Sequence, residues 1–169
     1  LHVLVAADAD EALAPLVAAE MKVTVEVPRM NVAEYHRPYV AIWIEHDDQS
    51  VAANLSHWYD LKLKNGEGTK WLKDMRQWWR RSGRELDFPV DGVSAATRPV
   101  GQHTLMFDGG EPPLADLPAG DYRLVVEAAR EVGGRGLLKL PFTWPPAAEQ
   151  LQETHGETEL GRIAIELVP

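Results

Sequence analysis

Hydrophobic and polar residues alternate along much of the chain after residue 20. In the segment KVTVEV, Val23, Val25 and Val27 fall on one face and polar side chains fall on the other. This period of two predicts a half-buried β-strand. The segment YVAIWIEH, residues 39–46, is apolar on both faces. A strand with two apolar faces is typical of the middle of a sheet, because both of its sides are covered.

Five further segments have strand character, with turn residues between them: 51–59, 102–107, 121–132, 137–144 and 162–168. The connections LPAGDY and GGRG are typical of antiparallel neighbours. A parallel α/β fold would need helices between most strands, and the sequence lacks them. We therefore expect a mostly β protein, an immunoglobulin-like antiparallel β-sandwich of about seven strands with one inserted α-helix.

The inserted helix is expected in KWLKDMRQWWRR, residues 70–81, where the period changes. Its apolar residues fall on one helical stripe: Trp71, Leu72, Met75, Trp78 and Trp79. The charged residues occupy the remaining surface. Most of these aromatic rings are therefore expected to pack in the core.

Length and composition indicate one globular domain. The 169 residues are 45% hydrophobic and 25% charged. We assign residues 21–169 to a single domain, and residues 1–20 to a leader remnant, a spacer or an extra strand, which the sequence does not distinguish. No segment approaches the eighteen or so apolar residues of a membrane span, so we expect a chain that does not span the membrane. The absence of cysteine excludes disulfides and thiolate chemistry.

The charge of the chain is unevenly distributed. The net charge of −9 argues against general nucleic-acid binding. Between Lys62 and Arg84, however, eight residues are basic and only Glu67 and Asp74 are acidic. This segment is either a solvated face or a surface oriented toward an anionic partner.

The loop VDGVSAATRPV, residues 90–100, is built almost entirely of small residues. Asp91-Gly92 favours a turn, because glycine adopts positive φ easily. An extended segment of such small residues could enter a narrow cleft of another enzyme and present the Thr97 hydroxyl there. Arg98, next in the chain, could then bind a phosphate. Without further information, an ordinary loop between helix and strand is the simpler interpretation.

The loop also resembles the motif to which bacterial flavin transferases attach FMN through a phosphoester on threonine. The resemblance rests on Asp91, Gly92, Val93, Ser94, Ala95, Ala96 and Thr97, and it departs at Ala95, where Gly or Ser is commoner. It implies covalent FMN on Thr97, with Asp91, Gly92, Ser94, Ala96 and Arg98 around the attachment site. Similar loops occur in the flavin-bearing subunits of sodium-translocating NADH:quinone oxidoreductase and of the Rnf complex.

A second resemblance covers residues 21–169. The segments VEVPRMNVAEYHRPYVAIWIE, KWLKDMRQWWRR, LPAGDYRLVVEAAREVGG and LPFTWPP are similar to the predicted periplasmic family called domain of unknown function 2271. This resemblance implies a periplasmic location, and as partners a flavin transferase and a membrane reductase with a PepSY-type domain.

Other groups of residues suggest further chemistry. Five aromatic side chains could stack on a flavin ring, although core packing is their commoner role: Trp58, Tyr59, Trp71, Trp78 and Trp79. Arg76, Arg80 or Arg81 could lie near the reduced form of the ring.

A metal site is a further possibility. A hairpin could bring His46 and His57 together beside Asp47 and Asp48 as metal ligands, but no established metal spacing occurs. No nucleophile elbow is present, which disfavours a serine hydrolase.

The function we expect is that of an exported electron carrier, not a stand-alone enzyme. FMN on Thr97 would take electrons from the membrane reductase and pass them to a periplasmic acceptor such as ferric iron. The alternative is a cofactor-free periplasmic binding module. It would use the basic segment to dock an acidic partner, or the His/Asp turn to hold a divalent metal.

Overall fold

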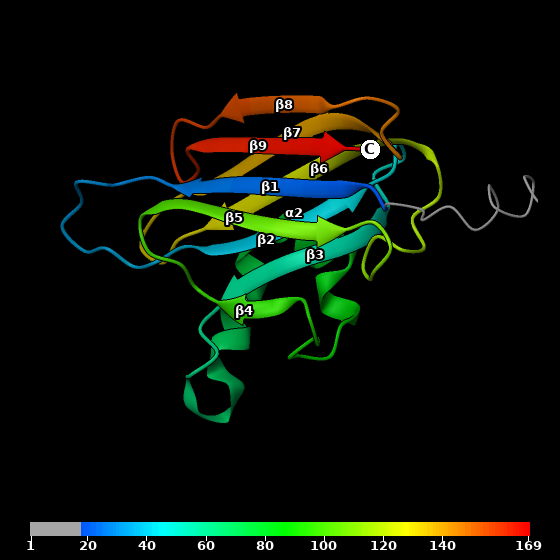
Figure 1. The fold of residues 1–169 in the computed structure, drawn as a ribbon. Helices are drawn as coiled ribbons and strands as arrows, with labels where there is room; N and C mark the ends of the chain where they lie inside the picture. Colours follow the sequence, from blue (N-terminus) through cyan, green and yellow to red (C-terminus); the bar gives the residue numbers. More distant parts are fainter. Residues whose placement is uncertain (1–17) are drawn as a thin grey trace, which may run out of the picture.

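Two β-sheets form the body of the protein in the computed structural model, which describes residues 18–169 (Figure 1). One sheet has four strands in the order β5 (Gly101–Asp108), β1 (Glu20–Val27), β9 (Arg162–Val168) and β8 (Gln150–His155). The other has five strands in the order β4 (Ser94–Ala96), β3 (Val51–Tyr59), β2 (Tyr39–Glu45), β6 (Gly120–Ala129) and β7 (Arg135–Trp144). The mostly β fold class is confirmed. Most of the segment expected to be a leader remnant or spacer lies outside the described residues.

All seven strands expected from hydrophobic periodicity are present. Strand β2, apolar on both faces, is central in the five-stranded sheet and is buried from Val40 to Glu45. Strand β6 is shorter than expected and ends at Ala129. The chain turns there because the N–H of Arg130 donates to the carbonyl of Gly134.

The count of about seven strands is too low, since the described residues contain nine. The two additional strands carry no hydrophobic alternation: β4 has three small residues, and β8 is mostly exposed and polar. The expectation of an entirely antiparallel arrangement is also wrong, because β4 pairs with β3 in parallel. Neither feature has a signal in the local sequence.

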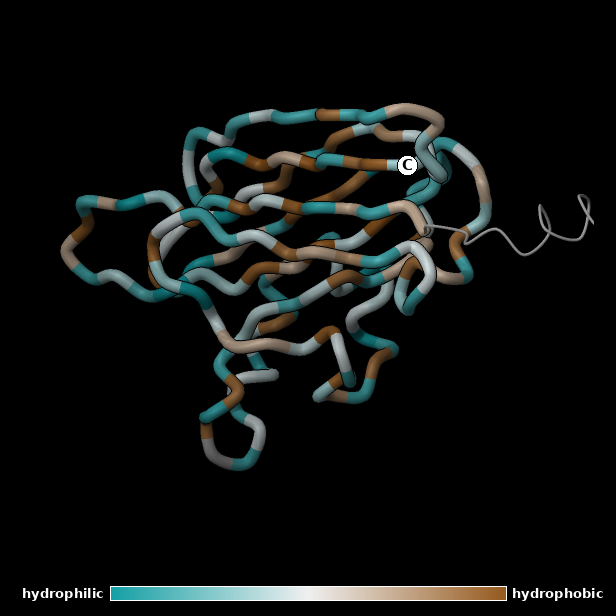
Figure 2. Tube along the Cα trace, in the orientation of Figure 1, coloured by the Kyte–Doolittle hydropathy of each residue, from teal (hydrophilic) through white to brown (hydrophobic). Residues whose placement is uncertain are grey.

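The main core lies between the two sheets. Val23 and Val25 of β1 meet Ile42 and Ile44 of β2 in one buried cluster, which also includes Trp58. Along many of the strands, hydrophobic residues alternate with hydrophilic ones (Figure 2). This alternation places one face of each strand toward the core.

The predicted helix over 70–81 is only partly correct. A 3₁₀ segment, η1 (Lys64–Asp74), leads into a short α-helix, α2 (Arg76–Arg81), followed by η2 (Gly83–Glu85). The backbone departs from helical geometry at Met75, with ψ of 75°. Beyond it, the carboxylate of Glu127 accepts hydrogen bonds from the N–H groups of Gln77 and Trp78, at 3.1 and 2.7 Å. A buried side chain of β6 thus fixes the start of α2.

The helical segments cover the outer face of the five-stranded sheet. Leu72, Met75 and Trp78 pack on this face against Trp43 and Val125 in a second buried cluster. The four-stranded sheet lies on the opposite side of the five-stranded one (Figure 1). The molecule therefore has three layers: sheet, sheet and helices.

The two sides of the sandwich are closed differently. On one side, the Gln150 carboxamide of β8 makes two hydrogen bonds to the backbone of Thr143 in β7. It accepts from the N–H at 3.3 Å and donates to the carbonyl at 3.2 Å. On the other side, residues 97–100 cross from the edge strand β4 to the edge strand β5. Thr97 therefore lies at the edge of the sandwich where the chain passes from the five-stranded sheet to the four-stranded sheet.

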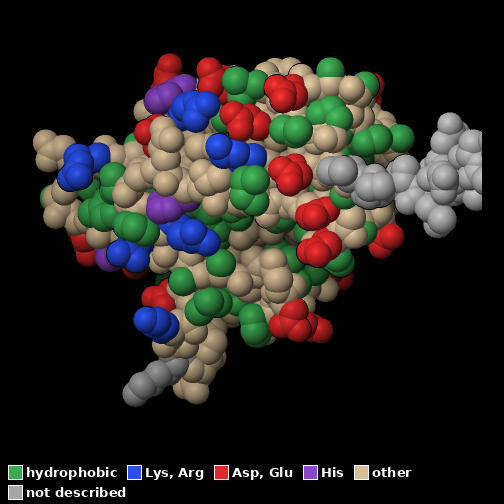
Figure 3. Space-filling model, viewed as in Figure 1, with side chains coloured by type: hydrophobic (Ala, Val, Ile, Leu, Met, Phe, Trp, Pro, Cys, Tyr) green, Lys and Arg blue, Asp and Glu red, His purple; other side chains and the backbone are tan. Residues whose placement is uncertain are grey.

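Thr97 also lies at the end of the sandwich where several loops gather. The connections between β1 and β2, between β4 and β5, and between β6 and β7 all occur at this end, on the left in Figure 1. On the face seen in Figure 3, Lys and Arg side chains lie toward the same end, interspersed with Asp and Glu, whereas the other end carries Asp and Glu side chains without cations. The loop end is thus the less acidic end of this face.

Candidate functional site

The small-residue loop, residues 90–100, begins with a tight turn. Gly92 has φ of 73°, as expected for glycine in a turn. The N–H groups of Val93 and Ser94 both donate to the carbonyl of Val90, at 3.1 and 2.9 Å. The turn anticipated at Asp91-Gly92 is confirmed, and Asp91 is exposed.

After the turn, the loop is not irregular, because it adds a strand to the sheet. Ser94, Ala95 and Ala96 pair in parallel with His57, Trp58 and Tyr59. Ala95 packs against the main core, whereas Ala96 is exposed. Small residues suit this position, since they let the strip lie close along β3.

Two polar side chains of β3 fasten the loop. The Ser56 hydroxyl donates to the carbonyl of Val93 at 3.1 Å, and the backbone N–H of His57 donates to the same carbonyl at 3.1 Å. The Nε2 atom of His57 is hydrogen-bonded to the Ser94 hydroxyl, which also accepts the N–H of Val90 at 2.8 Å. Ser94 therefore holds the loop from both directions.

His57 is completely buried among aromatic rings. Its ring centroid lies 5.2 Å from that of Trp78 and 5.4 Å from that of Phe88. Desolvation lowers the pKa of His57 from 6.5 to about 4. The imidazole is therefore neutral at pH 7, and its role is to position Ser94.

Thr97 follows β4 directly and is partly exposed. Its side chain makes no hydrogen bond or ion pair with the residues that the structure describes. The guanidinium of the adjacent Arg98 lies 5.0 Å from the centre of the Trp58 ring, in a cation–π contact. Next along the chain, the carbonyl of Pro99 is hydrogen-bonded to Nε2 of His103 at 2.7 Å. The chain around Thr97 is thus held in place while its hydroxyl stays unengaged.

The aromatic side chains proposed for flavin stacking divide into two groups. Trp58, Tyr59 and Trp78 are buried, in agreement with core packing, whereas Trp71 is 48% exposed. Trp79 is partly exposed and stacks on Phe88, with ring centroids 6.4 Å apart and planes inclined by 14°. Phe88 also touches His57, so this pair lies next to the loop. Sequence reasoning missed Phe88, which has no periodic pattern around it.

The basic residues of the helical segment do not gather at the loop. Arg81 donates to the Gln49 side chain at 2.6 Å, at the turn between β2 and β3. Arg76 lies near the turn between β6 and β7, and Arg80 is exposed on α2. Of the cations considered, Arg98 is the one next to Thr97.

The metal site considered at His46 and His57 does not form. His57 pairs with Ala41, whereas His46 follows the far end of β2. At about 3.3 Å per residue, the two histidines are roughly 17 Å apart along the hairpin. Within residues 18–169, no three His, Asp or Glu side chains gather in a metal-binding arrangement.

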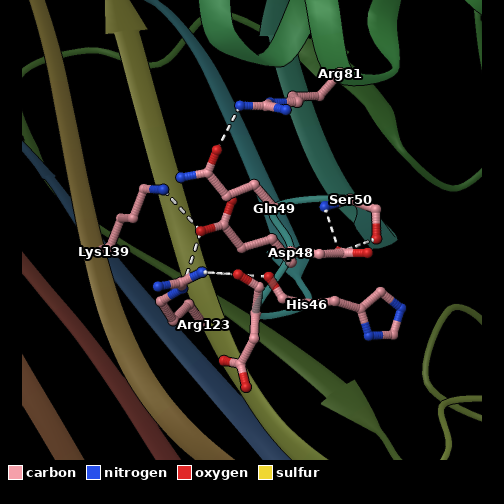
Figure 4. Close-up of polar contacts among 9 residues, drawn as sticks. His46, Asp48, Gln49, Ser50, Arg81, Arg123 and Lys139 are labelled. Atoms are coloured by element: carbon pink, nitrogen blue, oxygen red, sulfur yellow. Dashed lines mark hydrogen bonds and ion pairs between the residues drawn. The ribbon is translucent and has the colours of Figure 1, made fainter.

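The turn that follows β2 has a structural role instead (Figure 4). Glu45, fully buried, pairs with Lys139 at 2.7 Å and with Arg123 at 3.0 Å. Arg123 also donates to the carbonyl of Asp47 at 3.1 Å. The hydroxyl and N–H of Ser50 bond Asp48 and lower the pKa of its carboxyl group. These contacts stabilise the hairpin.

The fold and the loop together define a mostly β protein of two sheets that carries an ordered strip of small residues at one sheet edge. The chain belongs to the family described as "Predicted periplasmic protein (DUF2271)", whose model matches residues 20–162. This assignment confirms the resemblance of residues 21–169 to that family and places the protein in the periplasm. No curated protein and no solved structure matches the chain significantly. In the part of the chain that the structure describes, no helix is long and apolar enough to cross a membrane.

Proposed function

We propose that this periplasmic protein is an electron carrier with FMN attached to Thr97 by a phosphoester. The observation that carries the proposal is the state of Thr97. It is partly exposed, has no partner among the described residues, and follows a strand that is pinned to the sheet. The acceptor hydroxyl of Thr97 is therefore presented to a transferase at a defined position on an ordered segment.

The attachment chemistry is a phosphoryl transfer. The Thr97 oxygen attacks the phosphorus of an activated flavin nucleotide, and the phosphoanhydride bond of that nucleotide breaks. The hydroxyl proton passes to a base of the transferase, and the departing phosphate takes the electron pair of the broken bond. Arg98 supports this step, because it is adjacent to Thr97 and its guanidinium, 5.0 Å from the centre of the Trp58 ring, offers N–H donors to a phosphate oxygen.

The isoalloxazine ring needs an aromatic surface close to its tether. The stacked pair Trp79 and Phe88 is partly exposed and lies beside His57, which pairs with the loop. We propose this pair, and not the buried tryptophans, as the surface against which the ring packs. The flavin supplies the redox chemistry, and the protein supplies binding and orientation.

The partners in this proposal are a flavin transferase and a membrane reductase with a PepSY-type domain. On the face seen in Figure 3, the loop end carries the Lys and Arg side chains, which favours an acidic partner surface there. Electrons would pass from the reductase to FMN and on to a periplasmic acceptor such as ferric iron.

We further propose that the sandwich is of immunoglobulin-like type. The Tyr122 hydroxyl, near the start of β6, donates to the carbonyl of Pro118 at 2.6 Å. A tyrosine that bonds the backbone a few residues upstream, at the corner before a strand, is a feature of such sandwiches. This feature supports the topology expected from the sequence.

The test is the intact mass of the protein after co-expression with a flavin transferase. The wild type should gain the mass of one FMN less one water and turn yellow. Thr97→Val should abolish the gain, whereas Thr158→Val, which changes another exposed threonine, should retain it. A wild type that stays colourless beside a flavinylated control protein contradicts the proposal. The cofactor-free binding module is then the function that remains.

A further inference from the structure

A hollow of about 340 Å³ lies beside the turn between β6 and β7, and three arginines line it. Arg76 comes from the start of α2, Arg130 from the turn directly after β6, and Arg135 from the start of β7. Asp74 is the single carboxylate in the lining. Three cations from different elements thus converge on one concave surface.

Arg130 is held in place but not fully satisfied. Its side chain is only 6% exposed, and Glu159 accepts from Nε at 2.8 Å and from Nη2 at 3.3 Å. The remaining nitrogen, Nη1, is buried and has no partner among the described residues. Since a buried donor without a partner costs free energy, a ligand oxygen that reached this nitrogen would remove that cost.

The turn beside Arg130 is shaped around the guanidinium. A Cβ atom on Gly133 would lie 2.5 Å from Cζ of Arg130, so a larger residue there would displace the guanidinium from its pairing with Glu159. The preceding residue, Val132, has φ of 54°, a left-handed conformation that is costly for a β-branched side chain. The turn is therefore locally strained at Val132, and the Gly133 backbone packs directly against the Arg130 guanidinium.

Arg135 and Arg76 differ in how they are held. Nε of Arg135 donates to the buried Glu127 at 2.6 Å, which fixes the guanidinium plane and leaves the outer nitrogens free of described partners. Arg76 is exposed and forms no ion pair with a described residue. Glu127 and Glu159 offset part of the positive charge, but neither lines the hollow, and each is bonded to its arginine. The guanidinium of Arg76 and the outer nitrogens of Arg135 therefore have no described partner.

We propose that this hollow is a binding site for the phosphate group of a small molecule. Guanidinium groups bind phosphate oxygens in pairs of parallel hydrogen bonds. Three arginines offer more donors than the two oxygens of one carboxylate can use, whereas a terminal phosphate has three oxygens. The groups required are already in position.

The site is separate from the proposed flavin attachment. Ala95 and Gly136 occupy one row across the five-stranded sheet, through Trp58, Val40 and Ala128. At about 4.8 Å per strand, four steps put the two edges roughly 19 Å apart. The phosphate bound in the hollow is therefore not the phosphoester on Thr97, and this proposal does not rest on the flavin.

The test is an NMR titration of the unmodified protein with inorganic phosphate and with pyrophosphate at low ionic strength. Shifts should centre on the amides of Gly133 and Gly134. Arg76→Gln should weaken binding by roughly tenfold, because it removes a charge-assisted contact from an exposed residue without a partner of its own. Arg80→Gln, on the same helix but away from the hollow, should bind like the wild type.

Two further arms complete the experiment. Arg135→Gln should also weaken binding, and urea unfolding of that variant checks that it is folded. Acetate, which has a single carboxylate, is titrated in parallel and should bind more weakly than phosphate. The proposal is overturned if neither phosphate nor pyrophosphate shifts the Gly133 and Gly134 amides, if acetate binds as tightly, or if Arg76→Gln and Arg80→Gln behave alike.

Discussion

Nε2 of His57 and the hydroxyl oxygen of Ser94 lie 2.5 Å apart, in a bond that joins the central part of a sheet to the small-residue loop. His57 is buried in an aromatic cluster, and Ser94 lies at the sheet edge three residues before Thr97. Since β4 has only three residues, this side-chain bond supplies much of what keeps the loop in register.

Replacing Ser94 with alanine should therefore destabilise the protein. Ser94→Ala leaves Nε2 of His57 buried without a partner and frees the N–H of Val90. We expect the free energy of unfolding to fall by about 1–3 kcal/mol in urea titrations. Thr158→Ala, which removes an exposed hydroxyl that has no hydrogen bond to a described residue, is the control. A loss for Ser94→Ala no larger than that of the control would show that the bond contributes little.

The stability of the fold should depend on pH through His57. Burial lowers the pKa of His57 from 6.5 to about 4, so the unfolded chain takes up a proton at higher pH than the folded chain does. The contribution of the neutral imidazole is complete above pH 6.5 and is lost as the pH falls toward 4. NMR titration of the His57 ring should give a midpoint near 4. Urea unfolding of His57→Gln should show a flatter pH dependence over this window, and an unchanged slope would exclude His57 as its source.

Glu127 should be among the most sensitive positions in the protein. It is fully buried and bonds two N–H groups of α2 together with the guanidinium of Arg135. Glu127→Gln removes the charge, leaves Arg135 without its carboxylate, and replaces an acceptor by an amide donor. We expect a loss of roughly 3–5 kcal/mol in chemical denaturation. Glu85→Gln, an exposed control, should stay close to the wild type.

Substitution of two tryptophans of the helical region, Trp78 and Trp71, should lower the free energy of unfolding by clearly different amounts. Trp78 is fully buried, and its indole N–H donates to Asn54 at 2.9 Å. Trp78→Ala should cost about 3–5 kcal/mol, because it opens a cavity in the second buried cluster. Trp71, 48% exposed, should cost about 1 kcal/mol or less when it is changed to alanine. Similar losses for the two variants in thermal or urea unfolding would contradict the assigned burial.

Hydrophobic periodicity predicted the strands well, because each of them buries one or both faces against a neighbouring layer. The same logic failed for β4, whose Ser94 and Ala96 carry no such pattern and whose pairing depends on Ser56 and His57, far away in sequence. The helix over 70–81 is interrupted for a similar reason, since its α-helical part begins where Glu127 of β6 bonds it.

Within the candidate site, local chemistry predicted the turn at Gly92 but not the contacts that surround it. The positive φ follows from the Asp91-Gly92 pair alone. The contact of Arg98 with Trp58 joins the connection after β4 to β3 and becomes evident only in three dimensions. The hairpin at His46 was misjudged because the register of β2 with β3 places His57 toward its other end.

The carboxamide of Gln150 occupies the two backbone positions of Thr143 that a further strand would use. At that point the outer edge of β7 cannot template the addition of an extended peptide from another chain. The Gln150 side chain therefore opposes edge-to-edge association with another chain at this border of the five-stranded sheet. Replacing Gln150 should reduce solubility at high protein concentration before it reduces the stability of the fold.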